Sequence, residues 1–269
     1  MAMNAPKHNY HTHTERCKHA TGTVLQFAEA AQQRHMSVLG MTDHTPLPKG
    51  TFAHVRMRME ELDPYLADID RARETIKDLT ILKGLECDWH EDFKAFYEDE
   101  LIGKRHIDYL IGAVHWAPFR GEWMDMDQVD SPLRLMAYVN HFIQGMASGL
   151  FAFMAHPDIF GLTARLSEAD MQSAARDIAD AATTLSMPLE INGLGLRKRR
   201  VKTPHGLRSP YPLPAFWEQA ARHPITVVCN SDAHQPDDVD ASIDETRAFA
   251  GQCHLRELTL DEFLKRVRR

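Results

Sequence analysis

Short apolar runs alternate with longer segments of helical period along most of the chain. The runs are rich in Leu, Ile, Val or Phe and are bounded by polar or turn-forming residues, which is typical of strands. The run at residues 225–229 is apolar at almost every position, as in a strand covered on both faces of a parallel sheet. The pattern predicts seven strands, near residues 9–13, 37–43, 80–86, 108–115, 151–156, 188–192 and 225–231.

The intervening segments repeat apolar residues at the spacing of an α-helix. Val24, Phe27 and Ala31 form one such stripe after Thr23, a residue that often begins a helix, and Pro64 suits a first helical turn. The predicted helices cover residues 23–34, 60–77, 131–145, 168–185, 214–222 and 259–267. About seven β/α units therefore follow one another in one domain over residues 1–269, which favours a barrel-like α/β fold. An open parallel sheet is the alternative.

Composition narrows the class of protein. The chain has 269 residues, 43% of them hydrophobic and 26% charged, and a net charge of −7, which argues against a dedicated nucleic-acid binder. No apolar stretch approaches a membrane span, and the N-terminus lacks the apolar region of a secretory signal. The four cysteines lie far apart without a CxxC pair and are expected to be reduced thiols. A cytoplasmic protein that binds neither membrane nor nucleic acid is expected.

The chain contains sixteen histidines, and many of them lie where predicted strands end. In a parallel barrel the carboxyl ends of the strands open onto one face, where such folds build active sites. Imidazole and carboxylate groups are ligands of Zn, Mn and Fe, and the absence of paired cysteines argues against a structural zinc finger. The residues at the predicted strand ends are His11, His13, Asp43, His44, Glu86, His115, His156, Asn192, Asp232 and His234.

Four of these residues form two pairs, and the members of each pair are separated by one residue. His11 and His13 would project to the same side of an extended segment, and Asp232 and His234 repeat this spacing. One such pair is weak evidence for a metal. Two pairs together with the single residues at other strand ends predict a metal site much more strongly.

Several motifs carry a resemblance to a known family. The chain closely resembles histidinol-phosphate phosphatases of the PHP (polymerase and histidinol phosphatase) superfamily, in order and over nearly its whole length. The matching stretches are His11-Thr-His-Thr-Glu-Arg-Cys-Lys-His19-Ala-Thr-Gly, Thr42-Asp-His-Thr-Pro-Leu-Pro48, Gly84-Leu-Glu86, Gly112-Ala-Val-His115, Ala155-His-Pro157, Glu190-Ile-Asn192, Leu196-Arg-Lys198, Pro210-Tyr-Pro212 and Asn230-Ser-Asp-Ala-His234.

The resemblance implies a distorted seven-stranded β/α barrel, that is a TIM-like (β/α)7 barrel, holding three divalent metal ions. Zn, Mn and Fe all suit the ligand types. The implied ligands are His11, His13, Glu86 and Asp232 for the first ion, Glu86 with His115 and His156 for the second, and His19, His44 and His234 for the third. Independently of the family, clustered metals activate water and clamp phosphate oxygens, which suits phosphate-ester hydrolysis. Three divalent ions would also attract a phosphate dianion to an acidic protein.

Further residues are candidates for catalysis and substrate binding. Asp43 would either orient a ligand imidazole, the favoured interpretation, or protonate the leaving alkoxide. Arg197 matches a family arginine that resembles a phosphate clamp, and a guanidinium suits bidentate phosphate contact. Expected substrate contacts besides Arg197 are Arg165, Trp116, Tyr211 and Asp158.

These features together predict a metal-dependent phosphomonoesterase that hydrolyses L-histidinol phosphate in histidine biosynthesis. One alternative is a PHP phosphoesterase acting on nucleotides or oligonucleotide ends, although the only basic run, residues 197–202, is expected to be a solvated loop. Another is a non-catalytic metal-binding module, which the filled motif positions disfavour. The sequence does not determine the oligomeric state.

Overall fold

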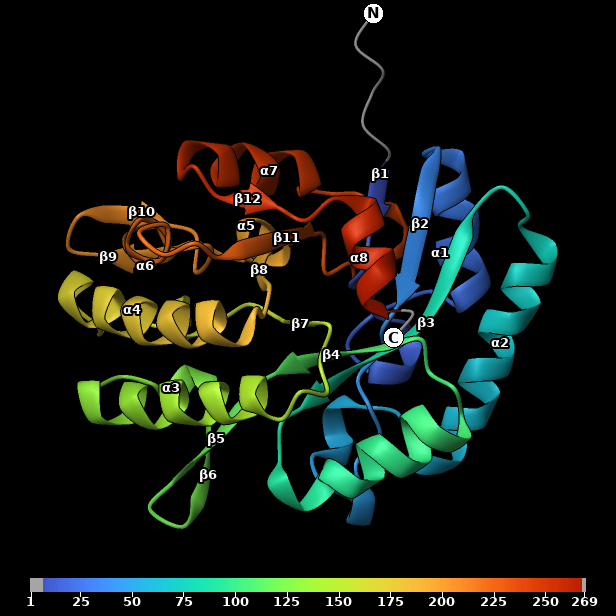
Figure 1. Cartoon of the computed structure of the whole chain (residues 1–269), viewed down its shortest axis with the longest axis horizontal. Coiled ribbons are helices and arrows are strands. Elements are labelled where there is room, and N and C mark those ends of the chain that lie inside the picture. The colour runs from blue at the N-terminus through green and yellow to red at the C-terminus, as the bar shows by residue number, and fades with distance from the viewer. Residues whose placement is uncertain (1–6, 268–269) are drawn as a thin grey trace, which may run out of the picture.

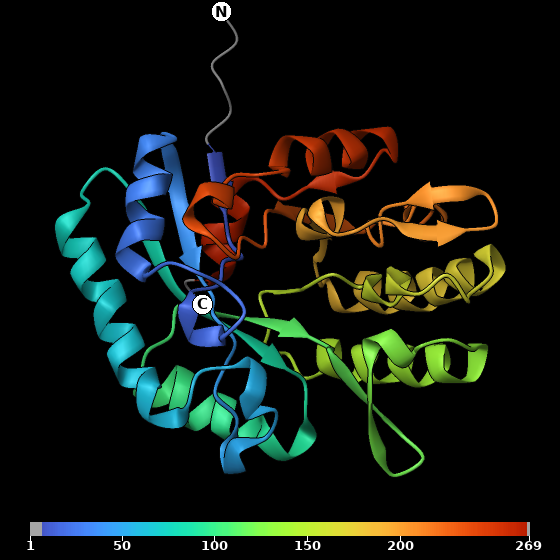
Figure 2. The ribbon, with the colours of Figure 1, turned by 180° about the vertical axis from the view of Figure 1, so that it is seen from behind.

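Eight parallel strands form one curved sheet surrounded by helices (Figures 1 and 2). The computed structural model describes residues 7–267, so residues 1–6, where no secretory signal is expected, lie outside it. The strand order is β1-β2-β3-β4-β7-β8-β11-β12, and the paired strands are parallel. The strands are β1 (Lys7–Asn9), β2 (Met36–Met41), β3 (Thr80–Asp88), β4 (Tyr109–Ala113), β7 (Phe153–Met154), β8 (Leu189–Asn192), β11 (Thr226–Asn230) and β12 (Arg256–Glu257).

Helices pack around the outside of this sheet. The six predicted helices are confirmed to within a few residues, and two of them begin with capping boxes, at Thr23 and at Ser167. The sequence did not predict α7 or the π-helix η6. The helices are α1 (Val24–Gln33), α2 (Leu62–Thr75), η6 (Phe96–Lys104), α3 (Pro132–Ala147), α4 (Glu168–Leu185), α5 (Leu194–Arg197), α6 (Pro214–Ala220), α7 (Ile243–Gln252) and α8 (Leu260–Val267).

The sheet curls until its first strand meets β11 at the carboxyl ends. A parallel bridge joins Thr12 to Ala233, and the His13 amide donates to the Ala233 carbonyl at 2.8 Å. Two asparagine side chains complete this seam: the Asn230 Oδ1 atom accepts from the Tyr10 amide, and Asn9 Nδ2 donates to the Val239 carbonyl. The predicted TIM-like α/β barrel is therefore confirmed, with β12 as a strand that the sequence did not predict.

Two hydrophobic cores flank the sheet. The larger core fills the space between the sheet and the helices, whereas a smaller one occupies the barrel interior. In the smaller core Phe263 of α8 stacks on Tyr10, with ring centroids 3.6 Å apart, and also contacts Phe153. Helix α8 thus closes the end of the barrel opposite to the carboxyl ends of the strands.

Two antiparallel hairpins interrupt the β/α alternation: β5 (Trp116–Phe119) with β6 (Glu122–Asp125), and β9 (Val201–Thr203) with β10 (Gly206–Arg208). The β5–β6 turn contains Arg120 and Gly121, both with positive φ, as type I′ hairpin turns require. The basic run 197–202 leads into β9, so its last residues form a hairpin strand where the sequence predicted a solvated loop.

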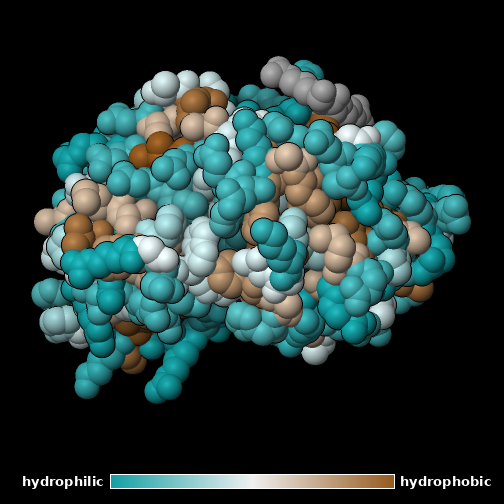
Figure 3. Space-filling model, turned by 90° about the horizontal axis from the view of Figure 1, so that it is seen from below, coloured by the Kyte–Doolittle hydropathy of each residue, from teal (hydrophilic) through white to brown (hydrophobic). Residues whose placement is uncertain are grey.

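The surface is mainly polar. Hydrophilic side chains cover most of the face drawn in Figure 3, and the hydrophobic areas between them are small. Among residues 7–267, no helix has both the length and the apolar character that crossing a bilayer requires.

Candidate metal centre

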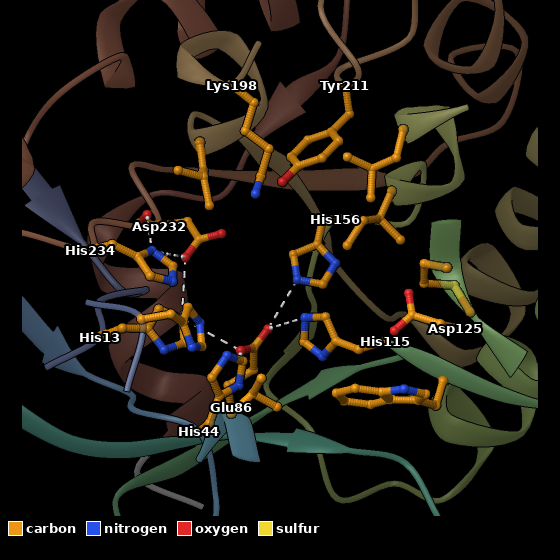
Figure 4. Close-up of a pocket in the computed structure, with 17 residues that line it drawn as sticks. His13, His44, Glu86, His115, Asp125, His156, Lys198, Tyr211, Asp232 and His234 are labelled. Atoms are coloured by element: carbon orange, nitrogen blue, oxygen red, sulfur yellow. Dashed lines mark hydrogen bonds and ion pairs between the residues drawn. The ribbon is translucent and has the colours of Figure 1, made fainter. Parts of the chain in front are cut away.

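Nine side chains, with the Glu86 carboxylate at their centre, converge at the carboxyl ends of the strands, and Figure 4 draws all of them except His11. They come from the ends of β1, β2, β3, β4, β7 and β11 and from the segment after β1, and eight of them line a cavity of about 260 Å³. They are the residues that the sequence motifs indicated: His11, His13, His19, His44, Glu86, His115, His156, Asp232 and His234.

Glu86 lies at the middle of this group and faces histidines with both oxygens. Its Oε1 atom is 3.0 Å from His156 Nε2 and 3.4 Å from His11 Nε2. Its Oε2 atom is 2.9 Å from His44 Nδ1 and 3.5 Å from His13 Nε2. Burial opposes ionisation of Glu86, but His11 and the other histidines outweigh it and hold the pKa of this carboxyl well below its usual value. An ionised, shared carboxylate is suited to bridge two cations.

The spacing of these atoms fits divalent metal ions. The Nε2 atoms of His11 and His13 face each other at 3.0 Å and lie 3.6 and 3.2 Å from Asp232 Oδ1. Tetrahedral coordination with bonds of about 2.0–2.1 Å separates neighbouring ligand atoms by about 3.3 Å. Asp232 Oδ1, Glu86 Oε2 and His44 Nδ1 are buried and have no hydrogen-bond partner among residues 7–267. Cations bound in this cluster would supply the missing partners.

A second part of the cluster consists of histidines alone. The His19 ring lies 5.2 Å from the His44 ring and 5.1 Å from the His234 ring, between centroids. The Nδ1 atoms of His19 and His234 are bonded to the carbonyls of Cys17 and Asp232, so their Nε2 atoms are available to a ligand. Burial lowers the pKa of His234 to about 3 and also lowers the pKa of His44, which keeps both in the neutral form that binds metal.

Glu190 and Asn192 fix the orientation of this cluster from β8. Glu190 Oε1 accepts from His11 Nδ1 at 2.9 Å, and Glu190 Oε2 accepts from the His156 amide at 3.1 Å. Asn192 Nδ2 donates to Glu190 and, at 3.0 Å, to Asp232. Among the sequence motifs, Glu190 belongs to Glu190-Ile-Asn192 but was not predicted as a site residue. A fully buried carboxylate in an apolar strand was the available signal, because such a group is nearly always paired.

Asp88 fixes the orientation of His115. It lies two residues after Glu86 on β3, and its Oδ1 atom accepts from the His115 amide at 2.8 Å and lies 3.1 Å from His115 Nδ1. Its Oδ2 atom accepts from the buried guanidinium of Arg56 at 2.7 Å. Neither Asp88 nor Arg56 was singled out by the sequence, because each acts through another residue.

Asp43 lies behind His13 and does not line the cavity. Its Oδ2 atom accepts from the amide and the hydroxyl of Thr14, and its Oδ1 atom accepts from the His44 amide at 2.8 Å and lies 3.8 Å from His13 Nδ1. Asp43 is fully buried. This placement favours the orienting role over direct proton donation to a leaving group.

Two predicted ligands have backbones in the left-handed region. His156 has φ of 30° and Asp232 has φ of 53°, values that non-glycine residues adopt at a cost. Each lies two positions after the end of a barrel strand, β7 or β11, and its side chain points into the cluster.

The predicted substrate contacts divide into two groups. Trp116 and Tyr211 line the cavity, as expected. Arg165 lies on the surface, paired with Asp130 at 2.7 Å and away from the cavity. Asp158 is buried behind the rim, where it accepts from the Leu213 amide and the Trp217 indole, so it does not contact this cavity.

Arg197 also differs from its expected placement. Its guanidinium donates to the backbone carbonyls of Ala241 and Ser231 at 3.0 and 2.9 Å, so it ties α5 to the segments after β11. The neighbouring Lys198 lines the cavity instead, and its side chain points inward beside Tyr211 (Figure 4). Among the residues lining this cavity, Lys198 is the only lysine or arginine.

A β/α barrel with histidines and carboxylates gathered at its carboxyl rim defines a metal-dependent barrel enzyme. The PHP domain family model matches residues 9–193, and the chain belongs to this family. A protein of Deinococcus radiodurans named as a probable histidinol-phosphatase is 32% identical over 243 residues, covering 85% of this chain and 86% of that protein.

Among solved structures, the histidinol phosphate phosphatase of Lactococcus lactis superposes with a TM-score of 0.71. It is 15% identical, and the match covers 95% of this chain and 96% of that one. That structure is a complex with zinc, L-histidinol and phosphate. The family resemblance and the fold predicted from the sequence are therefore both confirmed.

Proposed function

We propose that this protein is a metal-dependent phosphomonoesterase that hydrolyses L-histidinol phosphate to L-histidinol and inorganic phosphate. The observation that carries this proposal is the gathering of histidines and carboxylates around Glu86 at the floor of an open cavity. Membership of the PHP family and the name of the Deinococcus relative support it. The ligands of the Lactococcus structure suggest the substrate.

Bound divalent ions would supply an activated water and neutralise charge on the phosphoryl oxygens. In the arrangement we propose, His11, His13 and Asp232 share one ion with Glu86, and Glu86 shares a second with His115 and His156. His19, His44 and His234 hold a third. Zinc, manganese and iron all suit these nitrogen and oxygen ligands.

The remaining residues of the cavity bind and orient the phosphate. Lys198 supplies a positive charge at the cavity wall. Tyr211 supplies a hydroxyl: burial, together with Asp232 and other carboxylates, raises its pKa well above the usual value, so it stays protonated and can donate a hydrogen bond. Asp43 positions His13 from behind. Trp116 forms part of the cavity wall.

The size and charge of the cavity favour a small phosphomonoester. Lys198 is its only lysine or arginine, whereas binding of nucleic acid depends on several basic contacts to successive phosphates. A volume of about 260 Å³ also suits a compact substrate.

The test is phosphate release from L-histidinol phosphate, AMP, glycerol phosphate and a short oligonucleotide, measured as kcat/KM. The highest value is expected for L-histidinol phosphate. Chelation should remove activity, and added Zn²⁺, Mn²⁺ or Fe²⁺ should restore it, with more than one ion bound per chain by elemental analysis. If kcat/KM is equal or greater for a nucleotide, the assignment of L-histidinol phosphate as substrate is wrong. If the metal-free protein is fully active, the assignment of a metal-dependent reaction is wrong.

A further inference from the structure

The β5–β6 hairpin places a carboxylate and an indole side by side in the cavity wall. Trp116 on β5 is paired in register with Asp125 on β6, and both side chains line the cavity. They are nine positions apart in the sequence without a recognisable motif, so their pairing is visible only in the fold.

Asp125 differs from the other carboxylates that line the cavity. Glu86 and Asp232 are surrounded by histidines, whereas no residue in the described range 7–267 forms an ion pair with Asp125. Its Oδ1 atom accepts from the Asp127 amide at 3.2 Å, at the start of a short 3-10 helix. Burial raises the pKa of Asp125, so its charge lacks full compensation in the free protein. A cation beside it would supply that compensation.

The indole beside Asp125 is held firmly. Phe52 stacks on Trp116 with ring centroids 4.0 Å apart and planes 11° from parallel, and the guanidinium of Arg56 lies 5.6 Å from the Trp116 ring. Arg56 is itself fixed by its buried bond to Asp88. A rigid aromatic wall next to an anionic group suits a ligand in which a cation is attached to an apolar or planar body.

The two ends of the cavity therefore have different chemistry. Figure 4 shows Lys198 and Asp232 on one side and Asp125 on the other, with His115 and His156 between them. The phosphate end carries a lysine and the metal-binding histidines, and the other end carries the carboxylate without an ion pair. A phosphomonoester bound through its phosphate at the first end would extend toward the carboxylate at the other.

We propose that Asp125 is a specificity-determining residue whose carboxylate binds an ammonium group of the substrate, with Trp116 as the adjoining wall. The site would then select phosphomonoesters that also carry a primary amine close to the ester. This inference rests on the proposed function, since it assigns the part of the substrate that does not react.

The experiment compares matched substrates with and without the amine. One pair is L-histidinol phosphate and its des-amino analogue, and the other is phosphoethanolamine and ethyl phosphate. The variant Asp125→Asn keeps the side-chain shape and the acceptor for the Asp127 amide but removes the charge. We expect wild-type kcat/KM to be higher for the amine-bearing member of each pair. In Asp125→Asn this preference should fall by about ten-fold or more, mainly through KM, because a charge-assisted hydrogen bond is lost.

Glu122→Gln is the matched control, because Glu122 is exposed on the same hairpin and does not line the cavity. It should keep the wild-type preference. Metal content and melting temperature of Asp125→Asn should equal those of the wild type. An equal loss on both members of a pair, or an unchanged preference, would overturn the inference.

Failure of the proposed function has a different signature. In that case L-histidinol phosphate is a poor substrate for the wild type. The wild type would still prefer phosphoethanolamine to ethyl phosphate, and Asp125→Asn would lose this preference. That result would still support a role of Asp125 in amine binding. If the wild type shows no amine preference in either pair, the inference is wrong even where phosphate is released.

Discussion

Glu190 and His11 form a buried pair in which the carboxylate Oε1 atom lies 2.9 Å from the imidazole Nδ1 atom. Because a carboxylate only accepts, His11 donates through Nδ1, and its Nε2 atom is the one that faces Glu86 and His13. A side chain from β8 thus sets the protonation and direction of a ligand from the start of the barrel.

We predict that Glu190→Gln weakens metal binding without unfolding the protein. An amide is a poorer acceptor for the His11 proton and can present its NH₂ group instead, so the imidazole loses its fixed tautomer. Loss of such an outer partner typically costs about 10- to 100-fold in metal affinity or activity. Metal titration and elemental analysis measure this effect. Glu218→Gln, on the exposed side of α6, is the control and should bind metal normally. Unchanged affinity in Glu190→Gln would contradict the orienting role.

Glu86→Gln and Asp232→Asn should each abolish turnover while circular dichroism stays native. Each substitution preserves shape but removes a charge needed to hold divalent ions close together. Phosphate release and metal content per chain are the measurements, and both should fall together. A variant that retains wild-type kcat would remove that carboxylate from the proposed ligand set.

Lys198 and Arg197 should have separable effects, although they are neighbours in the sequence. Lys198→Ala should lower kcat/KM for phosphomonoesters by about ten-fold or more, with little change in stability, because the side chain is exposed and points into the cavity. Arg199→Ala, exposed and outside the cavity lining, is the control.

Arg197→Ala should instead destabilise the fold, by about 1–3 kcal/mol, because it removes donors to the carbonyls of Ser231 and Ala241. Urea denaturation measures this loss. The reverse result, with Arg197→Ala stable but weak in substrate binding and Lys198→Ala silent, would restore Arg197 as the phosphate clamp.

Glu257 should make stability depend on pH. Burial alone would raise the pKa of Glu257, but the nearby His8 ring and the Arg247 guanidinium, which donates to this carboxylate at 3.1 Å, outweigh it and lower the pKa. A carboxyl with a lowered pKa in the folded state contributes stability above its unfolded value of about 4.3, and this contribution is lost as the pH falls. Glu257→Gln should therefore be less stable than wild type at pH 7.5, by about 1–2 kcal/mol.

The difference in the free energy of unfolding between Glu257→Gln and wild type should be smaller at pH 4.0 than at pH 7.5. Urea denaturation at the two pH values gives both differences, and Glu245→Gln, exposed on α7, should match wild type at each. A difference that is the same at both pH values would assign the effect to packing rather than charge.

Much of the fold and the cluster of candidate ligands follow from local pattern in the sequence. Apolar runs and helical stripes placed the strands and most helices, and residues such as Glu86 and His115 were found because they end predicted strands. His19 shows the limit of this reasoning, since it follows no strand and only the family motif indicated it.

Other features depend on where side chains point and which strands pair, and the spacing of residues in the sequence does not determine either. Arg197 and Lys198 are adjacent at the end of a one-turn helix, and only the fold decides which of them faces the cavity. Trp116 and Asp125 meet through a hairpin whose turn, Arg120-Gly121, lacks the common Asn-Gly or Asp-Gly signal. Helix α7 was missed because few of its residues are apolar and buried.

The seam between β1 and β11 has a consequence for how the protein is made. Its hydrogen bond from Tyr10 to Asn230 joins residues 220 positions apart, and the same seam brings His11 and His13 to Asp232. A nascent chain therefore carries His11 and His13 through most of translation before Asp232 emerges. Such distant pairings form slowly, since loop closure precedes the contacts that reward it. The complete set of proposed ligands can therefore assemble only after His234, 35 residues from the end of the chain, has left the ribosome.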